Sequence, residues 1–305
     1  MNLGFMTVPF GHQTLEEIAA YAKEAGFSCL EVCCWPVASG DTRRYAGVTH
    51  IDVTRLDQAG ADAIRASLDA HGISISALGY YPNPLHPDPE HRAAVVDHLL
   101  HVIDAAPLLG VSTVTSFVGN DKSRPVTENL DELRTVWTPI VAHAEEREVR
   151  IAIENCPMIF SYDEWPGGNN LAYSPAIWRQ MFDAIPSEHF GLNFDPSHLV
   201  WQMIDVERAI DEFASRIYHV HAKDMEIDRN GLYGHGVMSA GIGWQVPRLP
   251  GLGEVDWPRF FAALYRNDYD GPVVIEHEDR RFEGSDEIVK RGFDLARDVL
   301  APYVV

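Results

Sequence analysis

The sequence lacks long hydrophobic runs and has few cysteines. No stretch of about 18 consecutive apolar residues occurs, so we expect no transmembrane helix. The first residues, MNLGFMTVPFGHQ, lack the basic start and apolar centre of a secretory signal, and the expected location is therefore the cytoplasm. The four cysteines, Cys29, Cys33, Cys34 and Cys156, are too sparse for a disulfide scaffold and lack zinc-finger spacing. We expect them to be reduced thiols.

Basic residues are also scarce. The chain has 24 lysines and arginines against 45 aspartates and glutamates, which gives a formal net charge of −21. A surface of this sign argues against nucleic acid as a partner, because binding to a phosphate backbone needs a basic surface. The sequence contains no GxGxxG after its first apolar run and no GxxxxGK[ST] motif, so it lacks the usual phosphate-binding loops. These absences favour a small substrate without phosphate.

What the sequence does contain is a regular alternation of apolar runs and helical patterns. The runs expected to form strands are residues 2–8, 27–34, 73–79, 111–119, 149–155, 190–195, 216–224 and 271–279. A helical pattern follows each of them, and this order indicates a parallel sheet with right-handed crossovers. Eight such units in 305 residues predict a single (β/α)8 TIM barrel that spans residues 1–305 as one domain. A doubly wound open sheet is the alternative.

Helix signals mark several boundaries in this pattern. Thr14 is a candidate N-cap, and Gly26 and Gly72 are candidate helix ends. Asp88 with Pro89, and Asp256 with Pro258, are typical helix starts. Two long loops, residues 155–174 and 225–255, exceed the usual length of a connection and are therefore expected to serve the function.

Four metal-type ligands stand at the ends of the last four apolar runs of this kind. They are Glu154 in IAIEN, Asp195 in GLNFD, His221 in YHVHAKD and Glu276 in PVVIEHED. In a barrel these strand ends meet at the carboxyl face, and three carboxylates gathered there need a cation. One imidazole with three oxygen ligands suits Mn2+ best, with Co2+, Mg2+, Fe2+ and Zn2+ as alternatives. Cys156 is either a further ligand or a small buried thiol.

Several other residues are candidates for binding a substrate. Lys223 follows His221 by two positions, so both side chains point to the same side of an extended strand. His12, Trp35 and Tyr80 stand after the first three strands, where they either contact a sugar or pack at the rim. His219 also alternates with His221, and we expected one of the two histidines to face the helices.

The motifs IAIEN, NFDPSH, HVHAKD, PGLGEVDW and GPVVIE together resemble the xylose-isomerase-like TIM barrel family of sugar isomerases and epimerases. The resemblance extends over essentially the whole chain. It implies that Glu154, Asp195, His221 and Glu276 bind one divalent metal ion. By similarity to ketose 3-epimerases, Glu154 and Glu276 also move protons, and His198 meets substrate oxygens. Glu31 matches a glutamate common at its barrel position, where it either contacts substrate or anchors loops.

The function that these residues favour is proton transfer next to the carbonyl of a ketose or keto-sugar, through an enediolate that the metal stabilises. An alternative is a metal-dependent lyase acting on 3-keto-glycosides, similar to the large subunit of C-glycoside deglycosidases and working with a small second subunit. Dehydration of a keto-inositol is another lyase option. An endonuclease-type phosphoesterase and a non-catalytic sugar-binding barrel are disfavoured. The resemblance also implies a homo-oligomer.

Overall fold

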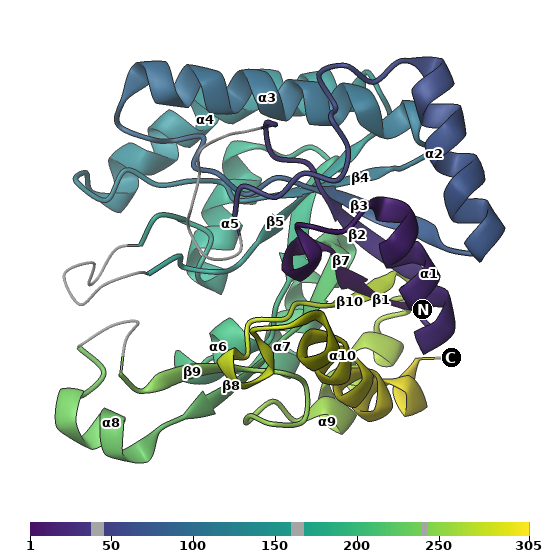
Figure 1. Ribbon diagram of the computed structural model, residues 1–305. Helices are drawn as coiled ribbons and strands as arrows, with labels where there is room; N and C mark the ends of the chain where they lie inside the picture. Colours follow the sequence, from purple (N-terminus) through teal and green to yellow (C-terminus); the bar gives the residue numbers. More distant parts are fainter. Residues whose placement is uncertain (38–45, 160–167, 239–242, 305) are drawn as a thin grey trace.

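The computed structural model describes residues 1–37, 46–159, 168–238 and 243–304 (Figure 1). Eight parallel strands close into a barrel in the order β1-β10-β7-β6-β5-β4-β3-β2. This architecture confirms the predicted (β/α)8 barrel. The barrel strands are β1 Asn2–Met6, β2 Cys29–Cys33, β3 Ser74–Gly79, β4 Thr113–Ser116, β5 Arg150–Glu154, β6 Phe190–Phe194, β7 Ile217–Ala222 and β10 Pro272–Ile275.

Helices surround the barrel (Figure 1). The α-helices are α1 Leu15–Ala25, α2 Gln58–His71, α3 Pro89–Leu108, α4 Val126–Glu145, α5 Pro175–Ala184, α6 Ser197–Trp201, α7 Val206–Phe213, α8 Arg229–His235, α9 Trp257–Arg266 and α10 Asp286–Leu300. Four short 3-10 helices complete the described set: η1 Val8–Phe10, η3 Ala214–Arg216, η4 Arg280–Phe282 and η5 Ala301–Tyr303. None of the helices in the described ranges is long and apolar enough to cross a membrane.

The helix signals in the sequence act as expected. Thr14 forms a capping box with Glu17 at the start of α1, and Gly26 ends that helix in the left-handed conformation with φ of 80°. Asp88 accepts hydrogen bonds from two backbone N–H groups of α3, and Asp256 accepts one from the backbone of α9. The short helix α6, which follows β6 directly, was not anticipated.

The segment from 225 to 255 is more ordered than the predicted loop. Within it, β8 (Asp224–Ile227) pairs antiparallel with β9 (Gln245–Arg248), and α8 lies between the two strands. Trp201, Met225, Ile227 and Trp244 form a small apolar cluster beneath this arm, which stabilises it apart from the main core. The arm projects from the barrel at the lower left of Figure 1. Residues 160–167 and 239–242 of the two predicted loops lie outside the described ranges.

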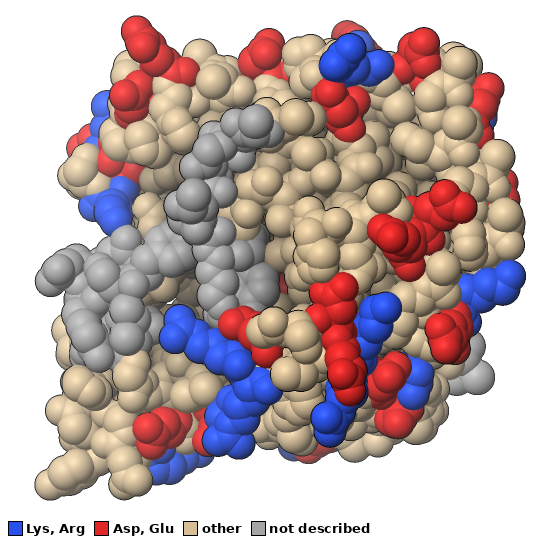
Figure 2. Space-filling view, in the orientation of Figure 1, with Lys and Arg blue, Asp and Glu red and all other residues tan. Residues whose placement is uncertain are grey.

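Apolar packing between the strands and the helices holds the barrel together. Phe5 of β1 is fully buried and contacts the rings of Phe10, Phe27 and Phe293 at centroid distances between 4.5 and 5.9 Å. Burying one such side chain stabilises the fold by about 1.5–3 kcal/mol. On the outside, acidic and basic side chains are intermixed over the face shown in Figure 2. The apolar packing between strands and helices thus fixes the positions of the carboxyl ends of the strands.

Candidate metal centre

The four predicted ligands meet at the carboxyl ends of four neighbouring strands. Glu154 is the last residue of β5, and His221 is the penultimate residue of β7. Asp195 and Glu276 follow the last residues of β6 and β10 directly. All four are buried or nearly so, with Glu154 2 % exposed and Asp195 and His221 fully buried. The topology thus delivers the chemistry that the sequence predicted to one place.

His221 lies between the two glutamates. Its Nδ1 is 3.3 Å from Glu276 Oε2 and 3.7 Å from Glu154 Oε2. Ligand atoms of these three residues all lie within 4.8 Å of one another, as a shared metal ion requires. Asp195 is beside this group but is not one of its members.

The donor atoms fit a divalent cation. His221 Nδ1, Glu154 Oε1 and Asp195 Oδ2 are buried and form no hydrogen bond among the described residues; their contacts are ion pairs, such as those from His221 Nδ1 to Glu276 at 3.3 Å and from Asp195 Oδ2 to Lys223 at 3.1 Å. Buried polar atoms are normally hydrogen-bonded, so three atoms on neighbouring strand ends that lack such bonds are available to a cation. Two glutamates, an aspartate and a histidine are donors that hard and borderline divalent ions accept.

Lys223 brings a positive charge into the cluster. Its side chain is 1 % exposed, and Nζ lies 2.7 Å from Glu276 Oε2, 3.1 Å from Asp195 Oδ2 and 3.2 Å from Glu278 Oε2. Burial alone would lower the pKa of this ammonium group, but the surrounding carboxylates raise it well above its ordinary value. Lys223 therefore stays charged and partly balances the carboxylates.

His198 enters the same cluster from α6. Its Nε2 is 3.3 Å from Asp195 Oδ2 and 3.7 Å from Glu154 Oε1. Burial and the nearby charge of Lys223 lower the pKa of the ring well below its ordinary value, so the imidazole is neutral. A neutral ring beside the carboxylates is able to donate one hydrogen bond and accept another.

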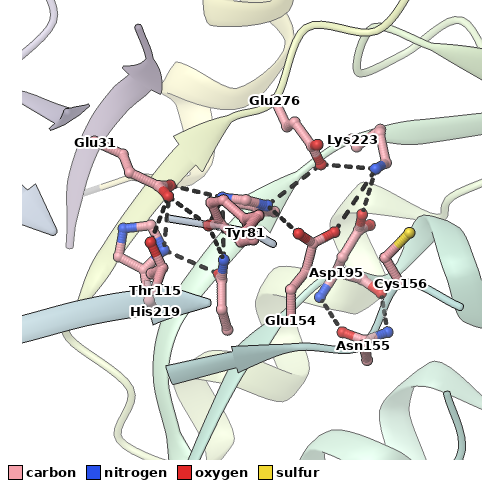
Figure 3. A network of polar contacts seen from close by, with 12 residues as sticks. Glu31, Tyr81, Thr115, Glu154, Asn155, Cys156, Asp195, His219, Lys223 and Glu276 are labelled. Atoms are coloured by element: carbon pink, nitrogen blue, oxygen red, sulfur yellow. Dashed lines mark hydrogen bonds and ion pairs between the residues drawn. The ribbon is translucent and has the colours of Figure 1, made fainter. Parts of the chain in front are cut away.

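Glu31 contacts Nε2 of His221, the ring nitrogen that does not face Glu154, and Figure 3 shows Glu31 and Glu154 apart from each other. Its Oε2 is 2.6 Å from His221 Nε2, and its Oε1 accepts hydrogen bonds from Tyr81 Oη at 2.5 Å and Thr115 Oγ1 at 2.6 Å. Burial alone would raise the pKa of Glu31, but His221 and the hydrogen bonds lower it to about 2. Glu31 is an ionised carboxylate that fixes the imidazole.

The prediction for the pair His219 and His221 was wrong. We expected His219 or His221 to face the helices, but both rings are fully buried inside the barrel, with centroids 5.7 Å apart. Residues two apart in a strand point to the same face, and that rule was misapplied to this pair. His219 lies 2.9 Å from Asn193 Oδ1 through Nδ1 and 3.2 Å from Ser76 Oγ through Nε2.

The pKa values of the two proton-transfer candidates, Glu154 and Glu276, are shifted in opposite directions. Burial, followed by the charge of Glu276, raises the pKa of Glu154 to about 8. Burial alone would also raise the pKa of Glu276, but Lys223 and His221 hold it well below its ordinary value. Carboxyl groups whose environments push their pKa values apart are typical of an acid and base pair.

The remaining candidates lie outside this cluster. The side chain of His12 is 66 % exposed and pairs with Asp286 at 2.9 Å. Trp35 and Tyr80 are each 3 % exposed and pack edge to face, and Tyr80 also contacts His98. Tyr81, which the sequence analysis did not select, is the tyrosine that reaches Glu31.

A cavity of about 290 Å³ opens at the amino end of the barrel, opposite the candidate metal centre. It is lined by residues near the amino ends of the strands, among them Asn2, Ser74, Ser112 and Arg150. None of the candidate metal-binding groups found among the described residues lines it. Active sites of barrels of this type lie at the carboxyl face, so we place the chemistry there.

Comparison with known proteins identifies the family of this barrel. A family model described as the xylose isomerase-like TIM barrel matches residues 19–299. The uncharacterized protein YfiH of Bacillus subtilis is 28 % identical over 316 residues, which cover 92 % of this chain and 93 % of that protein. An inosose dehydratase of Mesomycoplasma hyopneumoniae is 29 % identical over 127 residues, or 40 % of this chain and 42 % of the dehydratase.

Solved structures share the fold. D-psicose 3-epimerase from Clostridium cellulolyticum H10, solved with D-tagatose, superposes with a TM-score of 0.72 at 15 % identity and covers 100 % of this chain and 99 % of its own. The 3-keto-D-glucoside 4-epimerase of E. coli superposes with a TM-score of 0.67 at 16 % identity, over 99 % of this chain and 98 % of its own. At these identities the likeness concerns the fold alone.

Proposed function

The chain belongs to the xylose isomerase-like TIM barrel family, and from that premise we propose that it is a divalent-metal-dependent sugar isomerase or epimerase. The substrate is a ketose or a keto-sugar, and the reaction moves a proton on the carbon next to its carbonyl. The observation that carries the proposal is the placement of Glu154 and Glu276, with opposite pKa shifts, around His221 Nδ1.

In this proposal Glu154, Asp195, His221 and Glu276 hold the ion, with Mn2+ as the best match to one nitrogen and three carboxylate ligands. When bound, the ion supplies positive charge that stabilises the negative charge developing on substrate oxygens. Glu31 is a positioning residue, because its contact with His221 Nε2 leaves Nδ1 directed toward the glutamates.

The glutamates perform the proton transfer. In the metal-free protein the pKa of Glu276 lies well below its ordinary value, which favours Glu276 as the group that accepts the proton from carbon. The pKa of Glu154 is raised to about 8 in the metal-free protein, which favours Glu154 as the group that takes up a proton and returns it to carbon. Lys223 lies beside both carboxylates and His198 beside Glu154, and both are placed to donate hydrogen bonds to substrate oxygens.

A second candidate is dehydration of a keto-inositol, which the similarity to an inosose dehydratase supports. The first step is the same removal of a proton beside a carbonyl. The carbanion then expels a hydroxyl group from the neighbouring carbon, and the charged ammonium group of Lys223 gives that group a proton so that it leaves as water. The two candidates differ only after the proton has been removed.

Deuterium exchange tests both candidates. Ketoses, 3-keto-glycosides and a keto-inositol are incubated with the protein in D2O and followed by NMR, with Mn2+ and with a chelator. Exchange into a ketose without change of composition supports the isomerase, and loss of water or of an aglycone supports a lyase. Absence of Mn2+-dependent exchange with every compound contradicts the proposal. The homo-oligomer and the small second subunit stay predictions that rest on the family resemblance.

A further inference from the structure

Glu154 directs its two carboxylate oxygens at two different groups. Its Oε2 is the oxygen that lies 3.7 Å from His221 Nδ1. Its Oε1 lies 3.7 Å from His198 Nε2, on the other side of the carboxylate. The two oxygens of one carboxylate are able to bind two cations, so Oε1 is available to an ion other than the one that Oε2 binds beside His221.

Cys156 completes the group around Oε1. Glu154 ends β5 and Cys156 follows by two positions, with its sulfur on the side of Asp195 and Lys223 (Figure 3). Ligand atoms of Glu154, Cys156 and His198 all lie within 4.8 Å of one another. A thiol, an imidazole and a carboxylate form a softer donor set than the group around His221.

The backbone after Cys156 is shaped around the sulfur. Met158 adopts φ of 55°, a left-handed conformation that is costly for a residue with a side chain. Its N–H donates a hydrogen bond to Cys156 Sγ at 3.3 Å. An N–H directed at the sulfur stabilises negative charge there, which is the form of cysteine that binds metal.

His198 provides the independent sign of a ligand. The residue is 7 % exposed, and neither ring nitrogen forms a hydrogen bond among the described residues; Nε2 lies 3.3 Å from Asp195 Oδ2 and 3.7 Å from Glu154 Oε1. Glu154 Oε1 is likewise buried without such a partner. Two buried donor atoms that face one thiol are the arrangement expected of a metal-binding position.

We propose that Glu154, Cys156 and His198 form a second position for a thiophilic divalent cation, of the Zn2+ or Cd2+ class, bridged through Glu154 to the first. Binding replaces the S–H bond with a metal–sulfur bond and releases the proton to solvent. The inference rests on the proposed function only through Glu154, which both positions share. An ion at this position also occupies the His198 nitrogen that the proposed reaction uses.

Titration of the metal-free protein with Cd2+ tests this position directly. Thiolate bound to Cd2+ absorbs in the ultraviolet, and elemental analysis after dialysis counts the ions per chain. We expect the thiolate absorption in the wild type, and in Cys156→Ser we expect its loss together with one fewer ion. Cys29→Ser is the matched control, because Cys29 Sγ lies 3.9 Å from Asn2 O, far from the cluster in the fold. We expect Cys29→Ser to keep the thiolate absorption and the number of ions per chain of the wild type.

Two further variants separate the positions. His221→Asn removes a ligand of the first position, so we expect it to lose one ion and to keep the thiolate absorption. His198→Ala is expected to weaken Cd2+ binding at the thiolate at least 10-fold. Thiolate absorption that is missing from the wild type, or that survives Cys156→Ser, overturns the inference. Failure of the proposed function looks different, since it leaves the absorption intact while no sugar exchanges deuterium.

Discussion

The carboxylate of Glu31 lies 2.6 Å from Nε2 of His221 and is itself held by Tyr81 and Thr115. A metal-binding imidazole usually donates its second N–H to such a group, which fixes the tautomer and the direction of the ring. In this barrel the group comes from β2 and contacts Nε2, whereas Nδ1 of the same ring faces the proposed ligands Glu154 and Glu276. The contact with Glu31 is therefore expected to strengthen metal binding by His221.

Replacing Glu31 with glutamine removes the charge that holds His221. We expect Mn2+ affinity to fall by about 10- to 100-fold, because supporting groups of this kind typically contribute that much to metal binding. Isothermal titration calorimetry measures the dissociation constant, and circular dichroism verifies the fold. Glu16→Gln, the same change at an exposed position of α1, is the control. Unchanged Mn2+ affinity with a raised KM for the sugar would instead make Glu31 a substrate contact.

The proton-transfer assignment is tested by Glu154→Gln and Glu276→Gln. Each change keeps the size of the side chain and removes its capacity to carry a proton. We expect turnover of the substrate to fall by roughly 10²- to 10⁴-fold in each, the usual contribution of a general acid or base. Rates are measured at saturating Mn2+, so that weaker metal binding does not dominate. Full activity in either variant eliminates that glutamate from proton transfer.

His198→Ala separates a substrate contact from a ligand of the first ion. The neutral ring lies 3.7 Å from Glu154 Oε1 but is not in the group around His221. We expect kcat/KM to fall by on the order of 10-fold or more, the loss of a hydrogen bond made in the transition state. Bound Mn2+, counted by elemental analysis, should stay as in the wild type. Loss of Mn2+ from the variant would place His198 among its ligands.

Metal binding should release protons in a way that depends on pH. The pKa of Glu154 is raised to about 8, so the metal-free carboxyl is protonated at pH 6.5 and ionised at pH 9. A cation must displace that proton at the lower pH, and Mn2+ affinity is therefore expected to rise between these values. Calorimetry in two buffers with different ionisation enthalpies counts the protons released. Equal apparent enthalpies in both buffers at pH 6.5 would contradict the raised pKa.

The same shift sets a trend in the stability of the metal-free protein. Glu154 has a higher pKa in the folded than in the unfolded state, so its contribution to the free energy of unfolding is fully present at low pH. That contribution is lost as the pH rises through about 8. Added Mn2+ should therefore stabilise the protein more at pH 9 than at pH 6.5, which thermal denaturation measures.

Asp224 anchors the segment between the arm and α9. Its fully buried carboxylate accepts hydrogen bonds from the N–H groups of Met225, Gly251 and Val255 at 2.9 Å and from Trp257 Nε1 at 3.0 Å. Asp224→Asn replaces one acceptor oxygen with a donor that faces these N–H groups. We expect the free energy of unfolding to fall by about 1–3 kcal/mol. Urea denaturation measures it, with Asp183→Asn on the exposed face of α5 as control.

The barrel and the meeting of four candidate ligands at its strand ends were predictable because they follow from local patterns. Period-two and period-3.6 alternation specify strands and helices, and the closure of a parallel sheet brings its carboxyl ends together. Glu154, Asp195, His221 and Glu276 were found in this way. The order within 225–255 was not, since the antiparallel pairing of β8 with β9 depends on contacts across about 20 residues of chain that no local signal records.

Which side chains contact one another within the site could also not be predicted from the sequence. Tyr80 and Tyr81 are neighbours with the same chemistry, and only the direction of the backbone after β3 decides which one meets Glu31. The role of Glu31 depends on His221, which is 190 residues away in the chain. His219 shows the opposite case, because the periodicity of β7 already placed it beside His221.

Five strands of the barrel contribute to one buried polar layer: Glu31, Ser76, Thr115, Asn193, His219 and His221 all lie in it. A slip of one residue in β2 would turn Glu31 toward the surrounding helices and leave its charge without His221 or Thr115. Burying an unpaired carboxylate in that way is far more costly than misplacing an aliphatic side chain. The layer that supports the metal centre therefore also acts during folding as a check on strand register, since a misaligned barrel cannot satisfy it.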